Sequence, residues 1–206
     1  MTECNFVVLH DPADNKYVPG DVGQVAPHTQ MKIIDLKTGK SLPAGKDGEI
    51  CFRGPSKFKG YLDNEEATAR TIDKDGWLHT GDVGHYNEDE HLFITDRIKE
   101  IIKFRHFSVF PAEIEACLLE HDGIAGVVVI GVKHKVDGEC VRAYIELKKG
   151  IEVSENDIHK YMRERMGDQK QLRAGVVFID SIPRTIIGKP DRQHFKKMVK
   201  DEIIIT

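Results

Sequence analysis

Long hydrophobic runs are missing from this sequence of 206 residues. No apolar stretch approaches the ~20 residues that a bilayer-spanning helix needs, so no transmembrane segment is predicted. Residues Met1–Asn5 carry no basic region followed by an apolar stretch, which argues against a secretory signal. The final residues are Ile-Ile-Ile-Thr and not the peroxisomal address Ser-Lys-Leu. We therefore expect an intracellular protein, either cytoplasmic or peroxisomal.

Cysteine is also sparse, and the four cysteines lie far apart in the chain with no CxxC pair. This spacing favours buried free thiols over a disulfide framework or a zinc cluster. No dense basic stripe interleaved with aromatic residues is present, which argues against a nucleic-acid partner. No Gly-rich phosphate-binding loop occurs either.

Charge is plentiful but uneven along the chain. Residues 1–98 hold 11 Lys+Arg and 17 Asp+Glu, a balance of −6, and the remaining residues bring the net charge to −4. The second half is therefore at +2, which is only a weak indication of a phosphate-bearing partner. With 40% hydrophobic residues the chain can form one large or two modest domains. We place a boundary at Asp96–Lys99, where pattern and charge both change.

The first half is predicted to be β-rich. Alternation of apolar and polar residues predicts strands over 31–35 and 48–53, and a hairpin with its acidic tip at 87–90. The run 63–66 resembles a capping box, which predicts a short helix through Arg70. Residues 73–76 are typical of a turn.

The second half alternates between helices and strands. Pro111 can open a helix that Asp122-Gly123 ends, and Ser154–Asp157 is typical of a cap for a helix that stops at Gly167. Strands are expected at 127–132, 141–147 and 176–179, and a last helix at 191–200. The fold class expected is α+β: a β-rich part followed by a small domain with helices on a sheet.

Three segments carry residue types suited to nucleotide chemistry. Lys189 follows Gly188 on a Pro-bounded loop, where a mobile cation can meet developing negative charge on phosphate or carboxylate oxygens. Asp82 follows Thr80-Gly81, and a carboxylate can accept hydrogen bonds from both hydroxyls of a ribose. Arg97 offers a planar donor fork. Each also has an ordinary explanation: a surface lysine, a turn aspartate and an exposed ion pair.

In this order, the segments 75–82, 96–103 and 183–192 resemble the adenylate-forming, AMP-binding enzyme family of acyl-CoA synthetases, coumarate ligases and beetle luciferases. The resemblance implies an ATP-dependent acid–thiol ligase that activates a fatty or aryl carboxylic acid as acyl-AMP and transfers it to CoA. It implies that residues 1–96 are the β-rich end of the family's AMP-binding domain. Residues 97–206 would be its C-terminal domain.

The resemblance also implies residue roles. Lys189 would bridge the acyl carboxylate and the α-phosphate during adenylation, Asp82 would hold the AMP ribose, and Arg97 would contact the nucleotide. Thr2 and Glu3 match the end of a family segment in which threonine contacts phosphate and glutamate helps to hold Mg²⁺.

Two further positions concern the second half-reaction. Lys99 falls at the family's hinge, and Lys103 lies on the segment that moves to the active site for thioester formation. His106 stands where the family has glycine, and Ser108 where it has glutamine. Glycine allows close approach of the pantetheine arm and unusual torsions. Either the loop tolerates His106, or thioester formation with CoA is altered while adenylation is unaffected.

The resemblance places the phosphate loop, the adenine-binding segment and nearly the whole acyl pocket outside these 206 residues. Positioning of ATP is most of what the reaction needs, so we expect the isolated chain to be inactive in adenylation. The alternatives are a non-catalytic fragment that acts as a binding module, and a luciferase-like adenylating oxidase. An in-frame phosphate loop in the gene upstream of Met1 would favour the catalytic interpretation.

Overall fold

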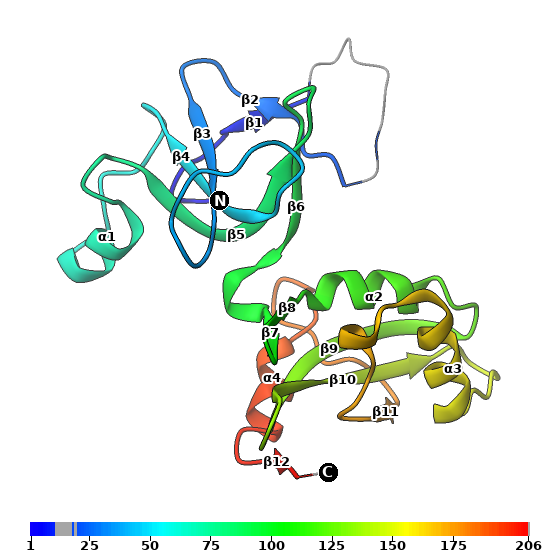
Figure 1. The fold of residues 1–206 in the computed structure, drawn as a ribbon. Coiled ribbons are helices and arrows are strands. Elements are labelled where there is room, and N and C mark those ends of the chain that lie inside the picture. Colours follow the sequence, from blue (N-terminus) through cyan, green and yellow to red (C-terminus); the bar gives the residue numbers. More distant parts are fainter. Residues whose placement is uncertain (11–17, 19, 206) are drawn as a thin grey trace. The chain divides into compact units, whose positions relative to one another are not determined.

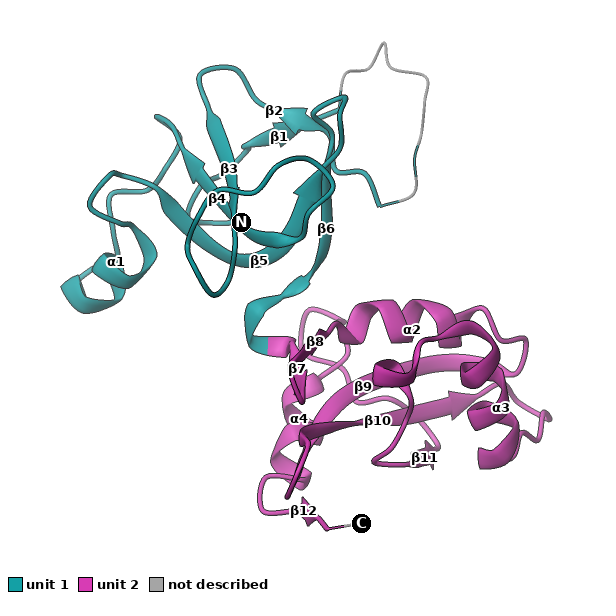
Figure 2. Cartoon of the chain, viewed as in Figure 1, with its two compact units in different colours: residues 1–99 teal, residues 100–206 magenta. Residues whose placement is uncertain are grey.

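The chain divides into two units (Figures 1 and 2). Each unit has its own hydrophobic core. The computed structural model describes residues 1–10, 18 and 20–205. The first unit covers Met1–Lys99 and the second Glu100–Thr206. The fold is mixed, with β-sheets and α-helices in both units, which confirms the predicted α+β class.

The N-terminal unit is built on a four-stranded antiparallel sheet in the order β3-β4-β5-β6. Its strands are β3 (Gln30–Ile34), β4 (Gly48–Arg53), β5 (Leu78–Tyr86) and β6 (Leu92–Arg97). A separate two-stranded ladder joins β1 (Val8–Leu9) to β2 (Gln24–Val25), and one helix, α1, spans Glu65–Thr71. Apolar side chains from the strands, such as Ile33, Ile50 and Leu78, are almost completely buried. Burial of this alternating face holds the sheet together.

The predicted strands and acidic hairpin of this unit are confirmed, but the capping box at 63–66 is wrong. The N-cap of α1 is Asn64, whose side chain accepts the Ala67 N–H at 2.9 Å. The third helical residue is then Ala67, which has no side-chain oxygen to return the bond. Asp63 precedes the cap in a left-handed conformation with φ +51°.

The C-terminal unit contains a six-stranded sheet in the order β12-β9-β10-β7-β8, with β11 also paired to β10. The strands are β7 (Ile102–Phe104), β8 (Phe107–Val109), β9 (Ile124–His134), β10 (Gly138–Leu147), β11 (Val176–Ile179) and β12 (Ile203–Ile204). The antiparallel pair β9–β10 is the centre of the sheet. Both faces of this pair are buried, because neighbouring residues such as Val129 and Ile130 are each 0% exposed.

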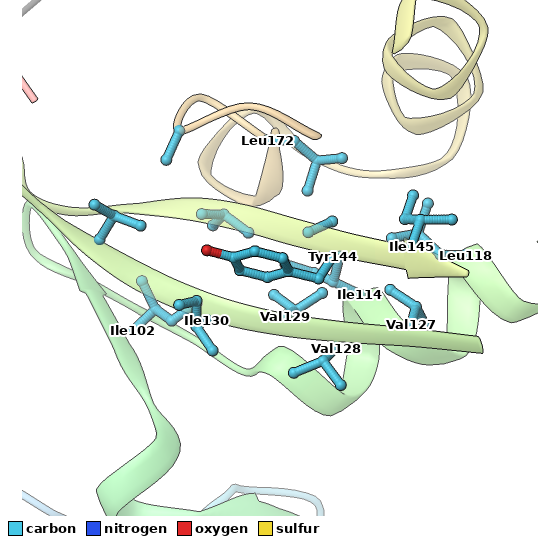
Figure 3. Packing of buried hydrophobic residues seen from close by; sticks show 14 of the residues in the cluster. Ile102, Ile114, Leu118, Val127, Val128, Val129, Ile130, Tyr144, Ile145 and Leu172 are labelled. Carbon is cyan, nitrogen blue, oxygen red and sulfur yellow. The ribbon is translucent and has the colours of Figure 1, made fainter. Parts of the chain in front are cut away.

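Helices and a continuous core complete this unit. The helices are α2 (Pro111–Leu119), α3 (Glu155–Arg165) and α4 (Arg192–Met198), with a short 3-10 turn η2 (Asp168–Lys170). Another 3-10 turn, η1 (Ile98–Glu100), spans the boundary between the two units. Figure 3 shows Tyr144 of β10 among the aliphatic side chains of this core. The Tyr144 ring packs on Phe195 of α4 at a centroid distance of 4.3 Å. This contact ties α4 to the sheet.

The capping box of α3 is confirmed, because Ser154 and Asp157 bond each other's backbone N–H groups. The predicted end of α2 is wrong: the helix ends at Leu119 and not beside Gly123. The His121 ring accepts the Gly123 N–H at 3.1 Å, and this side-chain bond replaces a further helical turn. All four cysteines are buried free thiols, as expected. Among the described residues, the helices are all too short or too polar to traverse a lipid bilayer.

Candidate functional site

A bulge in the N-terminal sheet presents Asp82. Glu49 of β4 lies opposite Val83 of β5, while Cys51 lies opposite His79. Three residues of β5, Thr80 to Asp82, therefore face the single residue Ile50. The surplus forms a bulge within β5, with Gly81 at φ +70°, a conformation that favours glycine.

Two side chains hold this bulge in place. The Thr80 hydroxyl donates to the Ile50 carbonyl at 2.7 Å and accepts the Asp82 N–H at 3.0 Å. The Glu49 carboxylate accepts the Gly81 N–H at 3.2 Å. Because the N–H groups of Gly81 and Asp82 are both bonded to side chains, the backbone at Asp82 is held in place before any ligand binds.

Asp82 and Arg97 meet across the paired strands β5 and β6. They are direct partners in the register, and Arg97 Nε lies 3.0 Å from Asp82 Oδ1. The Arg97 side chain is 57% exposed, so the ion pair itself contributes little stability. An exposed guanidinium beside an oriented carboxylate is free to exchange this contact for a polar ligand.

Thr2, Glu3 and Arg97 line one open hollow of about 520 Å³. Asp82 lines a neighbouring hollow of about 150 Å³, and both hollows include Met1 and Thr80. Glu3 is held by the Tyr61 hydroxyl, which donates to its Oε1 at 3.0 Å. The structure thus gathers the predicted residues of the first unit, although they come from opposite ends of its sequence.

Lys189 projects from a loop in the C-terminal unit. Gly188 N–H donates to the Thr185 carbonyl at 2.8 Å, and Thr185 N–H donates to the Lys189 carbonyl at 2.7 Å. Gly188 has φ +81°, a backbone conformation that favours glycine. Lys189 is exposed, and the loop also exposes Ile186 completely. An ordered loop with an exposed cation and apolar tip is suited to contact with another surface.

Both ends of this loop are anchored by carboxylates. Glu146 Oε2 accepts the Ile182 N–H at 2.8 Å before the loop. After it, Arg192 Nη2 donates to Glu115 Oε1 at 2.5 Å, and the same oxygen accepts the Val129 N–H at 2.8 Å. The Lys189 loop is therefore tied to β10, α2 and β9, and we expect it to move with the whole unit.

Lys103 and His106 lie on the β7–β8 hairpin, and both are exposed. Arg105 occupies the left-handed position of the turn, at φ +52°, whereas the φ of His106 is not positive. The unusual backbone torsion that we expected at position 106 therefore occurs at Arg105. The His106 ring packs against the Phe107 ring at a centroid distance of 4.1 Å.

A salt bridge holds this turn. Arg105 Nε donates to Asp137 Oδ1 at 2.7 Å, and the hydrogen bond and charge of Arg105 hold the pKa of Asp137 below its usual range. Lys99, the expected hinge, is exposed in η1, next to the point where the two units divide. Its role stays a prediction, as do the roles of the other predicted site residues and the assignment of residues 1–96 and 97–206 to family domains.

Sequence reasoning missed two residues at the bulge. Glu49 supports Gly81, and His79 contacts Glu49 through Nδ1 at 2.9 Å. Next to them, burial and the Glu49 charge raise the pKa of the Cys51 thiol to about 12. His79 lies in the same sequence segment as Asp82, but only the pairing of β4 with β5 shows that it contacts Glu49 and Cys51.

Comparison with known proteins agrees with these features. The model of the AMP-binding enzyme family matches residues 1–62, and the model of the AMP-binding enzyme C-terminal domain matches residues 113–189. A 4-coumarate–CoA ligase 1 of Glycine max is 43% identical over 206 residues, which cover 97% of this chain and 69% of the relative. The luciferin 4-monooxygenase of Photinus pyralis is 42% identical, over 97% of this chain and 36% of the relative.

Among solved structures, ATP-bound MatB from Rhodopseudomonas palustris matches with a TM-score of 0.91 at 33% identity. The match covers 98% of this chain and 40% of MatB. The chain thus spans little more than a third of the length of relatives such as the luciferin 4-monooxygenase. The sequence relatives and the structural match agree over nearly all of its residues: the chain belongs to the AMP-binding enzyme family.

Proposed function

We propose that this chain is part of an ATP-dependent acid–thiol ligase, and that it supplies nucleotide-binding residues and catalytic lysines. In the first half-reaction, a carboxylate oxygen of the acid attacks the α-phosphorus of ATP, and pyrophosphate leaves. In the second, the thiol sulfur of CoA attacks the acyl carbonyl, and AMP leaves. The observation that carries the proposal is the Asp82–Arg97 pair, which a fixed bulge presents beside the hollow that Thr2 and Glu3 line.

The first unit would bind the nucleotide. Asp82 would accept hydrogen bonds from the two ribose hydroxyls, and Arg97 would exchange its contact with Asp82 Oδ1 for a nucleotide oxygen. The Thr2 hydroxyl would donate to a phosphate oxygen. Hydrogen bonds to charged partners contribute about 1.5–3 kcal/mol each, so these contacts could account for a large share of AMP affinity.

The residues present fit a Mg²⁺ ion that travels with ATP. Mg²⁺ prefers one or two carboxylates together with substrate phosphates and water, and Glu3 supplies one carboxylate that Tyr61 already orients. When bound, the ion would neutralise phosphate charge.

The second unit would act through its lysines. Lys189 would place its ammonium group between the carboxylate and the α-phosphate, where negative charge develops as the new bond forms. Lys103 would serve the thioester step after a rotation about Lys99, since a hinge needs only a residue that absorbs a torsion change. Since His106 needs no unusual torsion, we include CoA as the acceptor thiol.

The acyl substrate proposed is a fatty or aryl carboxylic acid, by analogy with the 4-coumarate–CoA ligase relatives. We expect the 206 residues alone to release no pyrophosphate, because they contain no Gly-rich phosphate loop. A catalytic test must therefore supply the rest of the enzyme.

The test is a chimera in which residues 1–206 replace the matching segment of a full-length 4-coumarate–CoA ligase. We expect pyrophosphate release with ATP and 4-coumarate. Lys189→Ala should slow adenylation by about 10²–10³-fold, the usual effect of losing one preorganised electrostatic contact. Lys103→Ala should leave adenylation intact and slow thioester formation. Equal rates for Lys189→Ala and the exposed control Lys148→Ala would contradict the assignment.

A further inference from the structure

Three potential metal ligands converge behind the Thr80–Asp82 bulge. Glu49 and Cys51 lie two residues apart on β4, and His79 is the register partner of Cys51 on β5. His79 Nδ1 lies 2.9 Å from Glu49 Oε2 and 3.7 Å from Cys51 Sγ. One ligand atom from each of the three lies within 4.8 Å of the others.

These separations are close to those of a tetrahedral zinc site. With Zn–N and Zn–O bonds of about 2.0–2.1 Å and a Zn–S bond of about 2.3 Å, tetrahedral angles place N and O about 3.3 Å apart and N and S about 3.5 Å apart. The observed nitrogen–sulfur separation already fits. The nitrogen–oxygen separation needs to open by only a few tenths of an ångström. Little rearrangement would therefore be needed to take up an ion.

A second carboxylate, that of Asp73, lies behind the His79 ring. The far nitrogen of His79, Nε2, lies 3.5 Å from Asp73 Oδ2. Asp73 is itself fixed by the N–H groups of Asp75 and Trp77, each at 2.9 Å. A carboxylate behind a metal-binding histidine sets its tautomer and raises its affinity.

The site is closed on one side and open on the other. Cys51 is completely buried, whereas Glu49 and His79 line the 520 Å³ hollow together with Thr80 and Arg97. A metal ion could enter from this hollow and keep its fourth position for water. Glu49 would bind through Oε2, so Oε1 could keep its bond to Gly81.

A second group, His134, Asp137 and Cys140, meets the same distance criterion but is less suitable. His134 Nδ1 already accepts the Asp137 N–H at 2.9 Å, and Asp137 is engaged by Arg105. A metal ion there would have to displace a backbone hydrogen bond and a salt bridge. This group therefore serves as the internal control.

We propose that Glu49, Cys51 and His79 form a binding site for a thiophilic divalent cation, with Zn²⁺ as its natural occupant. Binding replaces the proton of the Cys51 thiol with the metal and releases that proton to solvent. The ion would lie beside the Thr80–Asp82 bulge. The proposal goes beyond the ligase function and does not depend on it.

The test is a titration of the purified chain with Co²⁺, a spectroscopic substitute for Zn²⁺. We expect one equivalent to produce a thiolate-to-cobalt charge-transfer absorption, which Zn²⁺ then abolishes by displacement. Cys51→Ser should lose the absorption, and the matched control Cys140→Ser should keep it. Asp73→Asn should lower the affinity for Co²⁺ by about 10–100-fold, the usual effect of changing a residue that contacts a metal-binding histidine.

Circular dichroism establishes that each variant is folded. Should Cys51→Ser fail to fold, His79→Asn and its control His134→Asn make the same comparison. The absence of a charge-transfer band at stoichiometric Co²⁺ would overturn the proposal. So would a band that survives loss of Cys51 or His79, or one that disappears with Cys140. In those cases the three residues are a hydrogen-bonded structural cluster.

Discussion

At the scale of single residues, Asp82 depends on neighbours that have no chemical role of their own. Glu49 and Thr80 hold the backbone on either side of Gly81, and the register sets Arg97 beside the carboxylate. The sequence identifies Asp82 and Arg97 by residue type and motif. It cannot identify Glu49 as a support, because that depends on a bulge between two strands separated by a helix.

Asp137 is the residue whose ionisation should stabilise the hairpin of Lys103. The hydrogen bond from Arg105 is the largest cause, and it lowers the pKa of Asp137. Desolvation acts in the opposite direction and raises this pKa, while the charges of Arg105, His134 and Arg173 lower it further. Since the folded pKa lies below the ordinary value of about 3.9, its stabilising contribution is complete above that value. The contribution is lost as the pH falls through the folded pKa.

An NMR titration of the Asp137 carboxyl carbon tests this. We expect a midpoint below the ordinary aspartate value, and an upward shift in Arg105→Ala that Arg165→Ala does not produce. An unshifted midpoint in the unmodified chain, or no change on removing Arg105, would show that the ion pair does not form in solution.

At the scale of elements, local patterns predicted most segments correctly. Period-two alternation predicts β4 with its observed bounds, and the Ser154–Asp157 box predicts the start of α3. Errors occurred where a side chain competed with the backbone, as at Asn64 and His121. The short strands β7 and β8 were missed, because three residues give no measurable period and only their pairing defines them.

The Lys189 loop offers a test at this scale. Gly188→Ala forces a residue with a Cβ into φ +81°, at an expected cost of about 1–2 kcal/mol. No atom beyond the two neighbouring residues lies within 4 Å of the added methyl group, so the effect should come from the backbone alone. If the loop relaxes and reorients Lys189, adenylation by the chimera should fall roughly tenfold, the equivalent of 1.4 kcal/mol.

Gly150→Ala is the matched control, since Gly150 has φ +77° and equally open surroundings. We expect both variants to lose the same stability in urea unfolding, with adenylation lowered only by Gly188→Ala. If both variants keep the full rate of adenylation, the conformation of the Lys189 loop does not limit catalysis.

At the scale of the whole molecule, the two cores should respond independently. Ile50 belongs to the core of the first unit and Ile114 to that of the second, and both are at most 1% exposed. Truncation to alanine should cost about 2–5 kcal/mol in each case. Because the cores are separate, each cost should be confined to one unit.

Hydrogen exchange on the full chain can read both units at once. Ile50→Ala should accelerate exchange in β3–β6 and leave β9–β10 unchanged, and Ile114→Ala should do the reverse. Limited proteolysis should leave a protected fragment close to residues 100–206. Loss of protection throughout the chain in either variant would mean that the units unfold as one.

The central claim is that the first unit carries a formed half of an adenylate site. The most direct measurement is calorimetric titration of the purified chain with an acyl-sulfamoyl-adenosine, a stable mimic of acyl-AMP. We predict saturable binding that Asp82→Ala weakens by about 10–100-fold, the loss expected for hydrogen bonds to a charged group. Glu88→Ala, an exposed acidic change at the tip of the same hairpin, should leave binding unchanged. No binding, or equal binding by both variants, would contradict the account.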